Sequence, residues 1–281
     1  MKKKVILALS AMMLLTGCGN ISHDSITPVS REDGSGTRGA FVELFDIQEK
    51  DENGEKMDMT TDMAEITNST AVMLLTVTGN KNAIGYISLG SLSNDVKAVS
   101  VDGVAATVDN INNGTYKVSR PFNIAVKEDL SELAADFIAF IMSDEGQAII
   151  EEKGYIQVQS NGAYTPCGLQ GTIVVAGSTS VAPVMEVLAD KYKELNSGVT
   201  IEIQQTGSSA GMTSTINGAC DIGMASREVK ESELAEGLIP TVIAMDGIAV
   251  IVNNDSSVTN LTSEQIKGIY TGEITDWNDV K

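Results

Sequence analysis

The stretch SREDGSGTR, at residues 30–38, places a glycine- and serine-rich turn directly before a helix-like segment. Two more stretches follow the same pattern: AGSTSVAP at residues 176–183 and GSSAG at residues 207–211. A helix start offers free backbone N–H groups and the positive end of the helix dipole, and small hydroxyl side chains add further donors. One such turn is ordinary, but three in one chain predict a binding site for an anion of about phosphate size.

Strand-like and helix-like segments alternate around these turns. Short β-branched runs occur at residues 84–88, 171–175, 200–204, 241–244 and 248–252. Helical periodicity occurs at residues 130–142 and 184–195, where apolar residues recur on one face. In a chain of 281 residues this alternation predicts an α/β protein of one large domain or two moderate ones.

The amino terminus has the pattern of an export signal. Three lysines precede an apolar run from Val5 to Leu15, which is too short to span a bilayer as a helix. The following LTGC, at residues 15–18, resembles the lipobox of bacterial lipoproteins, although an ordinary signal peptide with a chance cysteine remains an alternative. We expect a signal peptide at residues 1–17, lipidation of Cys18, and a tether at residues 18–25. The protein would then be attached to the extracytoplasmic face of the cell membrane by its lipid alone.

Charge and residue counts exclude several function classes. The formal net charge is −19, and removal of the three lysines in residues 1–17 leaves −22, so nucleic acid is not an expected partner. His23 is the only histidine, which argues against zinc sites and most hydrolase triads, and we predict no metal and no cofactor. Cys167 and Cys220 are far apart in the sequence, and free thiols are favoured over a disulfide.

Five motifs together resemble one known family. They are the three stretches above, DIGMASR at residues 221–227 and TGEITDW at residues 271–277. The chain resembles the substrate-binding lipoproteins of bacterial high-affinity phosphate ABC transporters, the Pst type. The resemblance implies a two-lobed, type II-like periplasmic-binding-protein fold with the ligand in the cleft. It also implies a monomer that binds inorganic phosphate and has the ABC permease subunits as partners.

The motifs stand in an unusual order. In the common family arrangement the AGST loop lies near the mature amino terminus, and the arginine loop follows the TGxIxxW segment. Here the chain ends four residues after Trp277, and the arginine loop begins at residue 30. This order predicts a circular permutation in which a linker at residues 160–170 joins the family's old termini. The rival interpretation is a fragment or a misassembled tandem gene.

The resemblance also predicts how the chain divides. Lobe one would be continuous, at residues 117–245, and would contain the linker. Lobe two would combine residues 26–116 with residues 246–281. Two crossovers between the lobes would form the hinge.

The resemblance assigns ligand contacts to both lobes. Lobe one would supply Thr179, Ser180 and Ser208, and lobe two would supply Arg31, Ser35, Gly36 and Thr37. Arg31 can direct two N–H groups at two phosphate oxygens, and we expect Asp33 to hold Arg31 from behind. Helix capping is the alternative role of the hydroxyl residues, and a solvated salt bridge is the alternative for Arg31. Arg38 is either a second contact or a surface residue.

Discrimination between phosphate and sulfate requires a hydrogen-bond acceptor, because only phosphate carries a proton at neutral pH. In many family members a carboxylate directly follows the serine that corresponds to Ser226, but here that position is Arg227. Asp246 is therefore predicted to be the acceptor, with a hinge turn as its alternative role. Ser226 and Arg227 would then act as donors.

An enzyme is the other function class that an anion site suggests. The sequence has no Gly-x-Ser-x-Gly motif and no Gly-x-x-x-x-Gly-Lys-[Ser/Thr] motif, and it has no histidine beyond His23. We therefore predict that the protein is not an enzyme. The alternatives within the binding class are a site for sulfate, molybdate or phosphonate and a phosphate-sensing surface protein.

Overall fold

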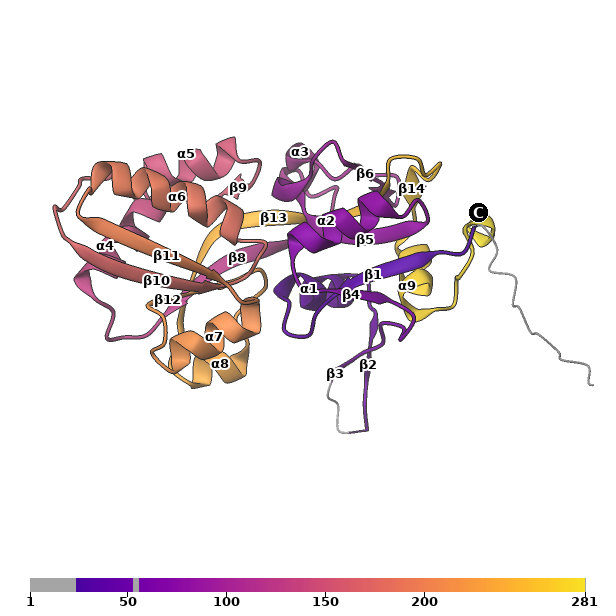
Figure 1. Ribbon diagram of the computed structural model, residues 1–281, viewed down its shortest axis with the longest axis horizontal. Coiled ribbons are helices and arrows are strands. Elements are labelled where there is room, and N and C mark those ends of the chain that lie inside the picture. Colours follow the sequence, from indigo (N-terminus) through magenta and orange to yellow (C-terminus); the bar gives the residue numbers. More distant parts are fainter. Residues whose placement is uncertain (1–23, 53–55, 281) are drawn as a thin grey trace, which may run out of the picture.

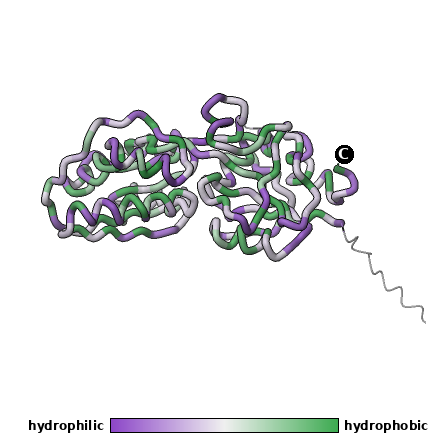
Figure 2. The backbone as a smooth tube through the Cα atoms, turned by 90° about the horizontal axis from the view of Figure 1, so that it is seen from above, coloured by the Kyte–Doolittle hydropathy of each residue, from purple (hydrophilic) through white to green (hydrophobic). Residues whose placement is uncertain are grey.

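The computed structural model describes residues 24–52 and 56–280, which form two α/β lobes side by side (Figure 1). The view from above, in Figure 2, separates the same two lobes. The predicted signal peptide and Cys18 lie outside the described residues. The two-lobed α/β architecture confirms the predicted fold class.

Lobe one is drawn at the left of Figure 1. Its helices cover both sides of its strands. The elements are β8 (Ser119–Val126), α4 (Glu132–Ile141), α5 (Asp144–Glu152), β9 (Ile156–Gln157), β10 (Gly171–Gly177), α6 (Ala182–Leu195), β11 (Val199–Gln205), α7 (Ser208–Ile216), β12 (Ile222–Ala225) and α8 (Glu231–Ala235).

Lobe two combines the beginning and the end of the described chain. The elements from its first part are β1 (Thr27–Arg31), α1 (Gly36–Leu44), β2 (Gln48–Lys50), β3 (Lys56–Asp58), β4 (Glu65–Thr67), α2 (Thr70–Gly79), β5 (Ala83–Ser88), the 3-10 helix η1 (Leu89–Ser91), β6 (Val96–Ala98), β7 (Ser100–Val101) and α3 (Val108–Asn112). Those from its second part are β14 (Asn260–Leu261), α9 (Ser263–Thr271) and η2 (Trp277–Asp279).

The long strand β13 (Ile239–Asn253) joins the lobes. Its first part pairs antiparallel with β8, and its second part, residues 248–252, pairs antiparallel with β5. The sheet therefore continues through both lobes in the order β11-β10-β12-β8-β13-β5-β1-β4. The predicted lobe boundaries fall just before β8 and within β13, so the two crossing strands are the segments that would form a hinge.

Each lobe has its own hydrophobic core. The core of lobe one takes residues from β8, α4, α6, β10 and β12, and the main core of lobe two takes residues from α1, β5, α9 and the second part of β13. In α6 the predicted apolar face is buried at Val184, Leu188 and Tyr192, while Leu195 at the end of the helix is 40% exposed. Periodic apolar residues therefore located this helix correctly.

The predicted linker contains no helix or strand. Residues 158–170 are half-buried or exposed, and Tyr164 anchors them because its ring packs edge-on against Phe140 and its hydroxyl donates to Asp136.

The two cysteines of the described chain are free thiols, as predicted. Cys167 is exposed and Cys220 is buried. At the other end of the molecule the N–H of Trp277 donates to the carbonyl of Asp24 over 2.9 Å, so the two described ends of the chain lie together.

No helix within residues 24–52 and 56–280 has both the length and the apolar character needed to cross a membrane.

Candidate functional site

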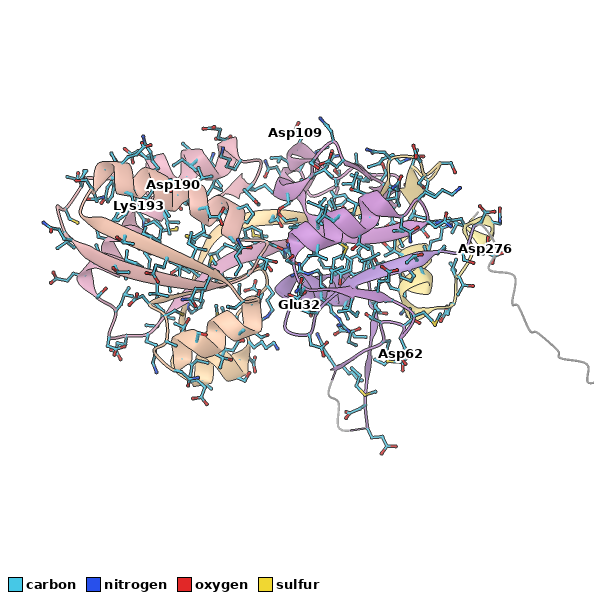
Figure 3. All side chains as sticks on the ribbon, viewed as in Figure 1. Glu32, Asp62, Asp109, Asp190, Lys193 and Asp276 are labelled. Atoms are coloured by element: carbon cyan, nitrogen blue, oxygen red, sulfur yellow. The ribbon has the colours of Figure 1, made fainter. Side chains whose placement is uncertain are left out.

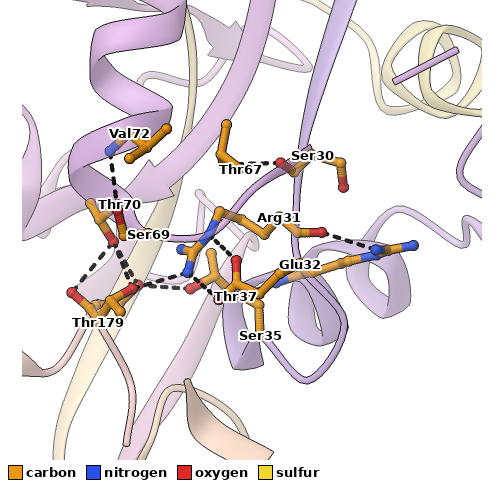
Figure 4. Close-up of polar contacts among 12 residues, drawn as sticks. Ser30, Arg31, Glu32, Ser35, Thr37, Thr67, Ser69, Thr70, Val72 and Thr179 are labelled. Atoms are coloured by element: carbon orange, nitrogen blue, oxygen red, sulfur yellow. Dashed lines mark hydrogen bonds and ion pairs between the residues drawn. The ribbon is translucent and has the colours of Figure 1, made fainter. Parts of the chain in front are cut away.

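Four helices begin where the two lobes meet. Helices α1 and α2 come from lobe two, and helices α6 and α7 come from lobe one. Ser35 caps α1 by accepting from the N–H of Arg38, and Ser69 caps α2 by accepting from the N–H of Val72 (Figure 4). Gly207, with φ of 88°, is the cap residue of α7, a backbone conformation that favours glycine. Together the helix starts direct their positive dipole ends toward one place, which favours an anion there.

A small, tightly closed cavity lies among these helix starts. All nine residues that line it are buried, and they come from both lobes. They are Arg31, Ser35, Gly36, Thr37, Ser178, Thr179, Ser180, Gly207 and Ser208. The lining includes all the predicted ligand contacts except Ser226, Arg227 and Asp246.

Arg31, at the end of β1, places the only guanidinium on the cavity lining. Its side chain is buried, and its Nε and Nη2 donate to the two carboxylate oxygens of Glu32 over 2.8 Å each. Nη2 also donates to Oγ1 of Thr179 in the other lobe over 3.0 Å (Figure 4). The rigid, permanently charged fork is thus fixed in place by its own lobe and contacts the opposite one.

The acid that pairs with Arg31 is Glu32, whereas the sequence predicted Asp33. The Asp33 side chain is 97% exposed and instead accepts from Nη1 of Arg38 over 2.9 Å. The same Nη1 donates to the carbonyl of Arg31 over 2.9 Å, and Nε of Arg38 pairs with Asp58. Arg38 is therefore neither a cavity contact nor a free surface residue, because it holds the arginine loop from outside. Figure 3 shows Glu32 where the two lobes meet.

Buried hydroxyl groups form a continuous network across the interface of the lobes. Thr37 lies 2.8 Å from Ser180 and 3.4 Å from Ser226, measured between hydroxyl oxygens. Ser226 accepts from Ser178 over 2.9 Å and lies 3.4 Å from Ser208. A hydroxyl can donate and accept, so each member can turn its proton to suit its neighbours or a ligand.

Sequence reasoning missed Thr70, which extends this network. Thr70 begins α2 and is 6% exposed, and its Oγ1 lies 3.4 Å from the hydroxyl oxygens of both Thr179 and Ser180. The signal that could have found it is Asn68-Ser69-Thr70 before an apolar run, which is typical of a capped helix start. Ser178 and Gly207 stood inside the quoted stretches but were not singled out.

Gly36 allows the lobes to approach closely. A Cβ atom at this position would lie 2.4 Å from the hydroxyl oxygen of Ser208 and 2.7 Å from that of Ser226, distances that real Cβ atoms do not show. The backbone of α1 therefore touches the lobe-one serines directly. A side chain at residue 36 would have to displace both of these hydroxyl groups.

Asp246 lies on β13 directly opposite Arg120 on β8, away from the cavity lining. Its Oδ2 accepts from Nη2 of Arg120 over 3.1 Å and its Oδ1 accepts from the Ser88 hydroxyl over 2.8 Å. Complete burial raises the pKa of Asp246 to about 6, and the attraction of Arg120 and the Ser88 hydrogen bond partly offset this rise. Asp246 therefore lies outside the cavity lining, and its role as a ligand acceptor stays a prediction.

Arg227 also has its partners outside the cavity. Its Nη1 and Nη2 form a bidentate pair with Glu233, over 2.9 and 2.7 Å, and Nη2 donates to the Ser209 hydroxyl. Burial raises the pKa of Glu233, but the hydrogen bonds from Arg227 and Lys230 lower it, and the net direction is downward. Arg227 thus fixes the loop before α8. Ser226 does not line the cavity but belongs to the hydroxyl network.

Comparison with known proteins identifies the family of this chain. A family model described as the PBP superfamily domain matches residues 19–145 and 163–281. Phosphate-binding protein PstS 2 of Streptococcus agalactiae serotype V is 50% identical over 98% of this chain and 97% of its own length. The chain belongs to the PstS family of periplasmic-type binding proteins. A crystal structure of the phosphate-binding protein of a Streptococcus pneumoniae phosphate ABC transporter matches with a TM-score of 0.72 and 45% identity, over 92% of this chain and 100% of that one.

The PstS relatives differ in how much of the chain they match. Phosphate-binding protein PstS of Bacillus subtilis is 31% identical, but over only 39% of this chain and 37% of its own length. A permuted order of segments would produce such a partial match, because one continuous alignment can follow only one of the two displaced parts. The circular permutation stays a prediction, and the Streptococcus agalactiae relative aligns with this chain from end to end.

Proposed function

We propose that this PstS-family protein captures inorganic phosphate outside the cell membrane and delivers it to the permease subunits of an ABC transporter. The observation that carries the proposal is the buried cavity lined by donors from both lobes around a single guanidinium. Relatives that match nearly the whole chain are phosphate-binding proteins by name, and the crystal structure with the matching fold belongs to a phosphate ABC transporter.

The proposed contacts divide between the lobes. Arg31 would bond two phosphate oxygens, and the hydroxyl and backbone N–H groups of the lining would bond the others. The lobe-two contacts are Arg31, Ser35, Gly36 and Thr37, and the lobe-one contacts are Ser178, Thr179, Ser180, Gly207 and Ser208. Ser226 would support them through Ser178 and Ser208, and Glu32 would orient Arg31.

Transport requires that the cavity open and close. All lining residues are buried when the lobes touch, so phosphate can enter or leave only if the lobes separate. β8 and β13 are the strands that connect the two cores, and bending of these strands would open the cleft. A ligand that contacts both lobes favours the closed arrangement, and the permease would recognise that arrangement.

Calorimetric titration of the exported part of the chain with phosphate tests the proposal. We expect one site per monomer and a melting temperature that rises with phosphate concentration, because the ligand binds only the folded state. Sedimentation should show a monomer with and without phosphate. Absence of phosphate binding by a folded monomer would overturn the proposed function.

The membrane attachment is a separate part of the proposal and rests on the sequence. We propose that Cys18 carries a lipid and is the sole anchor. Cys18→Ser should release the protein into the medium or leave an unprocessed precursor, while the matched change Cys167→Ser should leave the protein in the membrane fraction. Incorporation of a fatty-acid label into the Cys18→Ser variant would contradict the assignment.

A further inference from the structure

The hydroxyl group of Thr70, in lobe two, lies against the turn of lobe one that lines the cavity. Thr70 is the first residue of α2 and is 6% exposed. Its Oγ1 lies 3.4 Å from the carbonyl oxygen of Thr179, and also 3.4 Å from the hydroxyl oxygens of Thr179 and Ser180 (Figure 4). Thr70 does not itself line the cavity. Its three contacts all cross from one lobe to the other, to residues that do line it.

The backbone carbonyl of Thr179 lacks the helical partner that its neighbour has. The turn before α6 already follows the helical pattern, because the N–H of Ala182 donates to the carbonyl of Ser178, four residues earlier, over 3.0 Å. By the same spacing the carbonyl of Thr179 would accept from residue 183. That residue is Pro183, which has no N–H. Because Thr179 is buried, its carbonyl needs a donor from elsewhere.

Thr70 offers that donor from the opposite lobe. A carbonyl oxygen can only accept, so the hydroxyl of Thr70 donates to it, while the lone pairs of Thr70 Oγ1 remain open to the hydroxyl of Thr179 or Ser180. The Thr179 hydroxyl also accepts from Nη2 of Arg31 over 3.0 Å. Lobe two therefore holds the Thr179 turn from two sides, by the arginine loop and by the start of α2.

These contacts of Thr70 exist only while the lobes touch. When the lobes separate, water can take the place of the Thr70 hydroxyl at the Thr179 carbonyl. Phosphate is captured by the open arrangement and released by leaving the closed one. A residue whose contacts all lie between the lobes therefore acts on release rather than on capture.

We propose that Thr70 is a further positioning residue of the phosphate site. Its hydroxyl supplies the hydrogen bond that Pro183 withholds from the Thr179 carbonyl, so that the turn of lobe one is fully bonded only when the lobes are closed, and phosphate is retained longer. This inference rests on the proposed phosphate function and names a residue that controls the rate of release.

Thr70→Val tests the role of the hydroxyl, because valine has nearly the same shape and no donor. The release of radiolabelled phosphate from the exported part of the chain into an excess of unlabelled phosphate gives the dissociation rate constant. Calorimetry gives the affinity, and the two together give the association rate constant. We expect Thr70→Val to release phosphate about threefold to tenfold faster, with an association rate constant within about twofold of the parent, because a neutral hydrogen bond of this length contributes modestly. Thr70→Ser keeps the hydroxyl and should release phosphate at the rate of the parent.

Thr78→Val is the matched control in the same helix. Thr78 is exposed, and its hydroxyl donates to the carbonyl of Asp95 within lobe two. This variant should release phosphate as the parent does. If Thr70→Val released phosphate no faster than Thr78→Val, or changed only the association rate constant, the inference would be overturned and the proposed function would stand. Failure of the parent to bind phosphate would instead overturn the proposed function.

Pro183→Ala tests the assigned partner. It restores an N–H that can donate to the Thr179 carbonyl from within lobe one, at an exposed position where alanine favours the helix. Introduced into Pro183→Ala, the change Thr70→Val should alter the release rate by less than about twofold, because the carbonyl then has a partner in its own lobe. A merely structural role of Thr70 would not depend on residue 183. Equal acceleration by Thr70→Val with and without Pro183→Ala would overturn the assignment of the Thr179 carbonyl as its partner.

Discussion

The hydroxyl oxygens of Thr37 and Ser180 lie 2.8 Å apart, although Thr37 belongs to the first turn of α1 in lobe two and Ser180 to the turn before α6 in lobe one. Two neutral hydroxyls in contact cost little to separate, because each net hydrogen bond contributes only about 0.5 to 1.5 kcal/mol. The hydroxyl contacts between the lobes can therefore part easily. A ligand that bonds both sides adds the attraction that the hydroxyl contacts lack.

Gly36→Ala should weaken phosphate binding by at least tenfold. The new methyl group would lie 2.4 Å from the Ser208 hydroxyl oxygen and 2.7 Å from the Ser226 hydroxyl oxygen, so it would displace both hydroxyl groups from the surface on which the lobes close. The lobes themselves should fold, because alanine favours a helix. Calorimetry gives the affinity, and small-angle scattering with saturating phosphate should show a more open molecule than the parent.

The matched control is Gly39→Ala in the same helix, where a Cβ atom would have no neighbour within 4 Å. This variant should bind phosphate as the parent does and should be slightly more stable. If Gly36→Ala bound phosphate as tightly as Gly39→Ala, the lobes would not close in the way that the structure shows.

Arg31→Ala should weaken phosphate binding by at least about tenfold, and Ser35→Ala should weaken it less. Charge-assisted hydrogen bonds contribute about 1.5 to 3 kcal/mol, compared with about 0.5 to 1.5 kcal/mol for neutral ones, and the deletion also leaves the phosphate charge without a partner. Lys191→Ala removes an exposed cation from α6 and should have no effect on affinity. If the phosphate affinity of Arg31→Ala in the titration were within twofold of that of the parent, the binding site would lie elsewhere.

Local patterns predicted the loops of the site because a helix start is determined by a few adjacent residues. The cavity lining includes residues from all three glycine- and serine-rich stretches, and the helical periodicity of apolar residues located α6. Thr70 was missed because its role depends on where α2 lies relative to lobe one, which no short pattern encodes.

The two acids were harder to assign, for physical reasons. Asp33 and Glu32 are adjacent in one loop, and only the path of that loop decides that Glu32 faces Arg31 while Asp33 faces Arg38. Asp246 was predicted from its position near a crossover, but its partner Arg120 is 126 residues away in sequence and becomes its neighbour only through the pairing of β8 with β13. Long-range pairing of this kind is visible in the folded structure alone.

Asp246 should make the stability of the protein depend on pH in the acidic range. Burial raises its pKa in the folded state to about 6, above the ordinary value of 3.8, so the fold favours the protonated carboxyl. This contribution is fully present below about pH 4 and is lost as the pH rises through about 6. The free energy of unfolding of the parent, minus that of Asp246→Asn, should therefore decrease between pH 4 and pH 6.5 and stay constant above it.

Urea denaturation of the two proteins at a series of pH values measures this difference. A parent-minus-Asp246→Asn difference that is flat from pH 4 to pH 7, or that rises with pH, would show that Arg120 keeps Asp246 ionised in the fold.

Reordering the chain tests the predicted circular permutation. A variant that runs from residue 167 to residue 280, continues through a short glycine- and serine-rich connection to residue 24, and ends at residue 166 restores the common family order. The connection is short because the N–H of Trp277 donates to the carbonyl of Asp24 over 2.9 Å. The cut falls in the exposed linker and leaves Tyr164 attached to the segment that it anchors. The contacts of the cavity are unchanged, and relocating an exposed connection alters only loop-closure entropy, which depends weakly on length.

We expect a compact monomer in sedimentation and a phosphate affinity within about threefold of the parent by calorimetry. An aggregated product, or a monomer that does not bind phosphate, would contradict the permutation and favour the alternative of a fragment or a misassembled tandem gene.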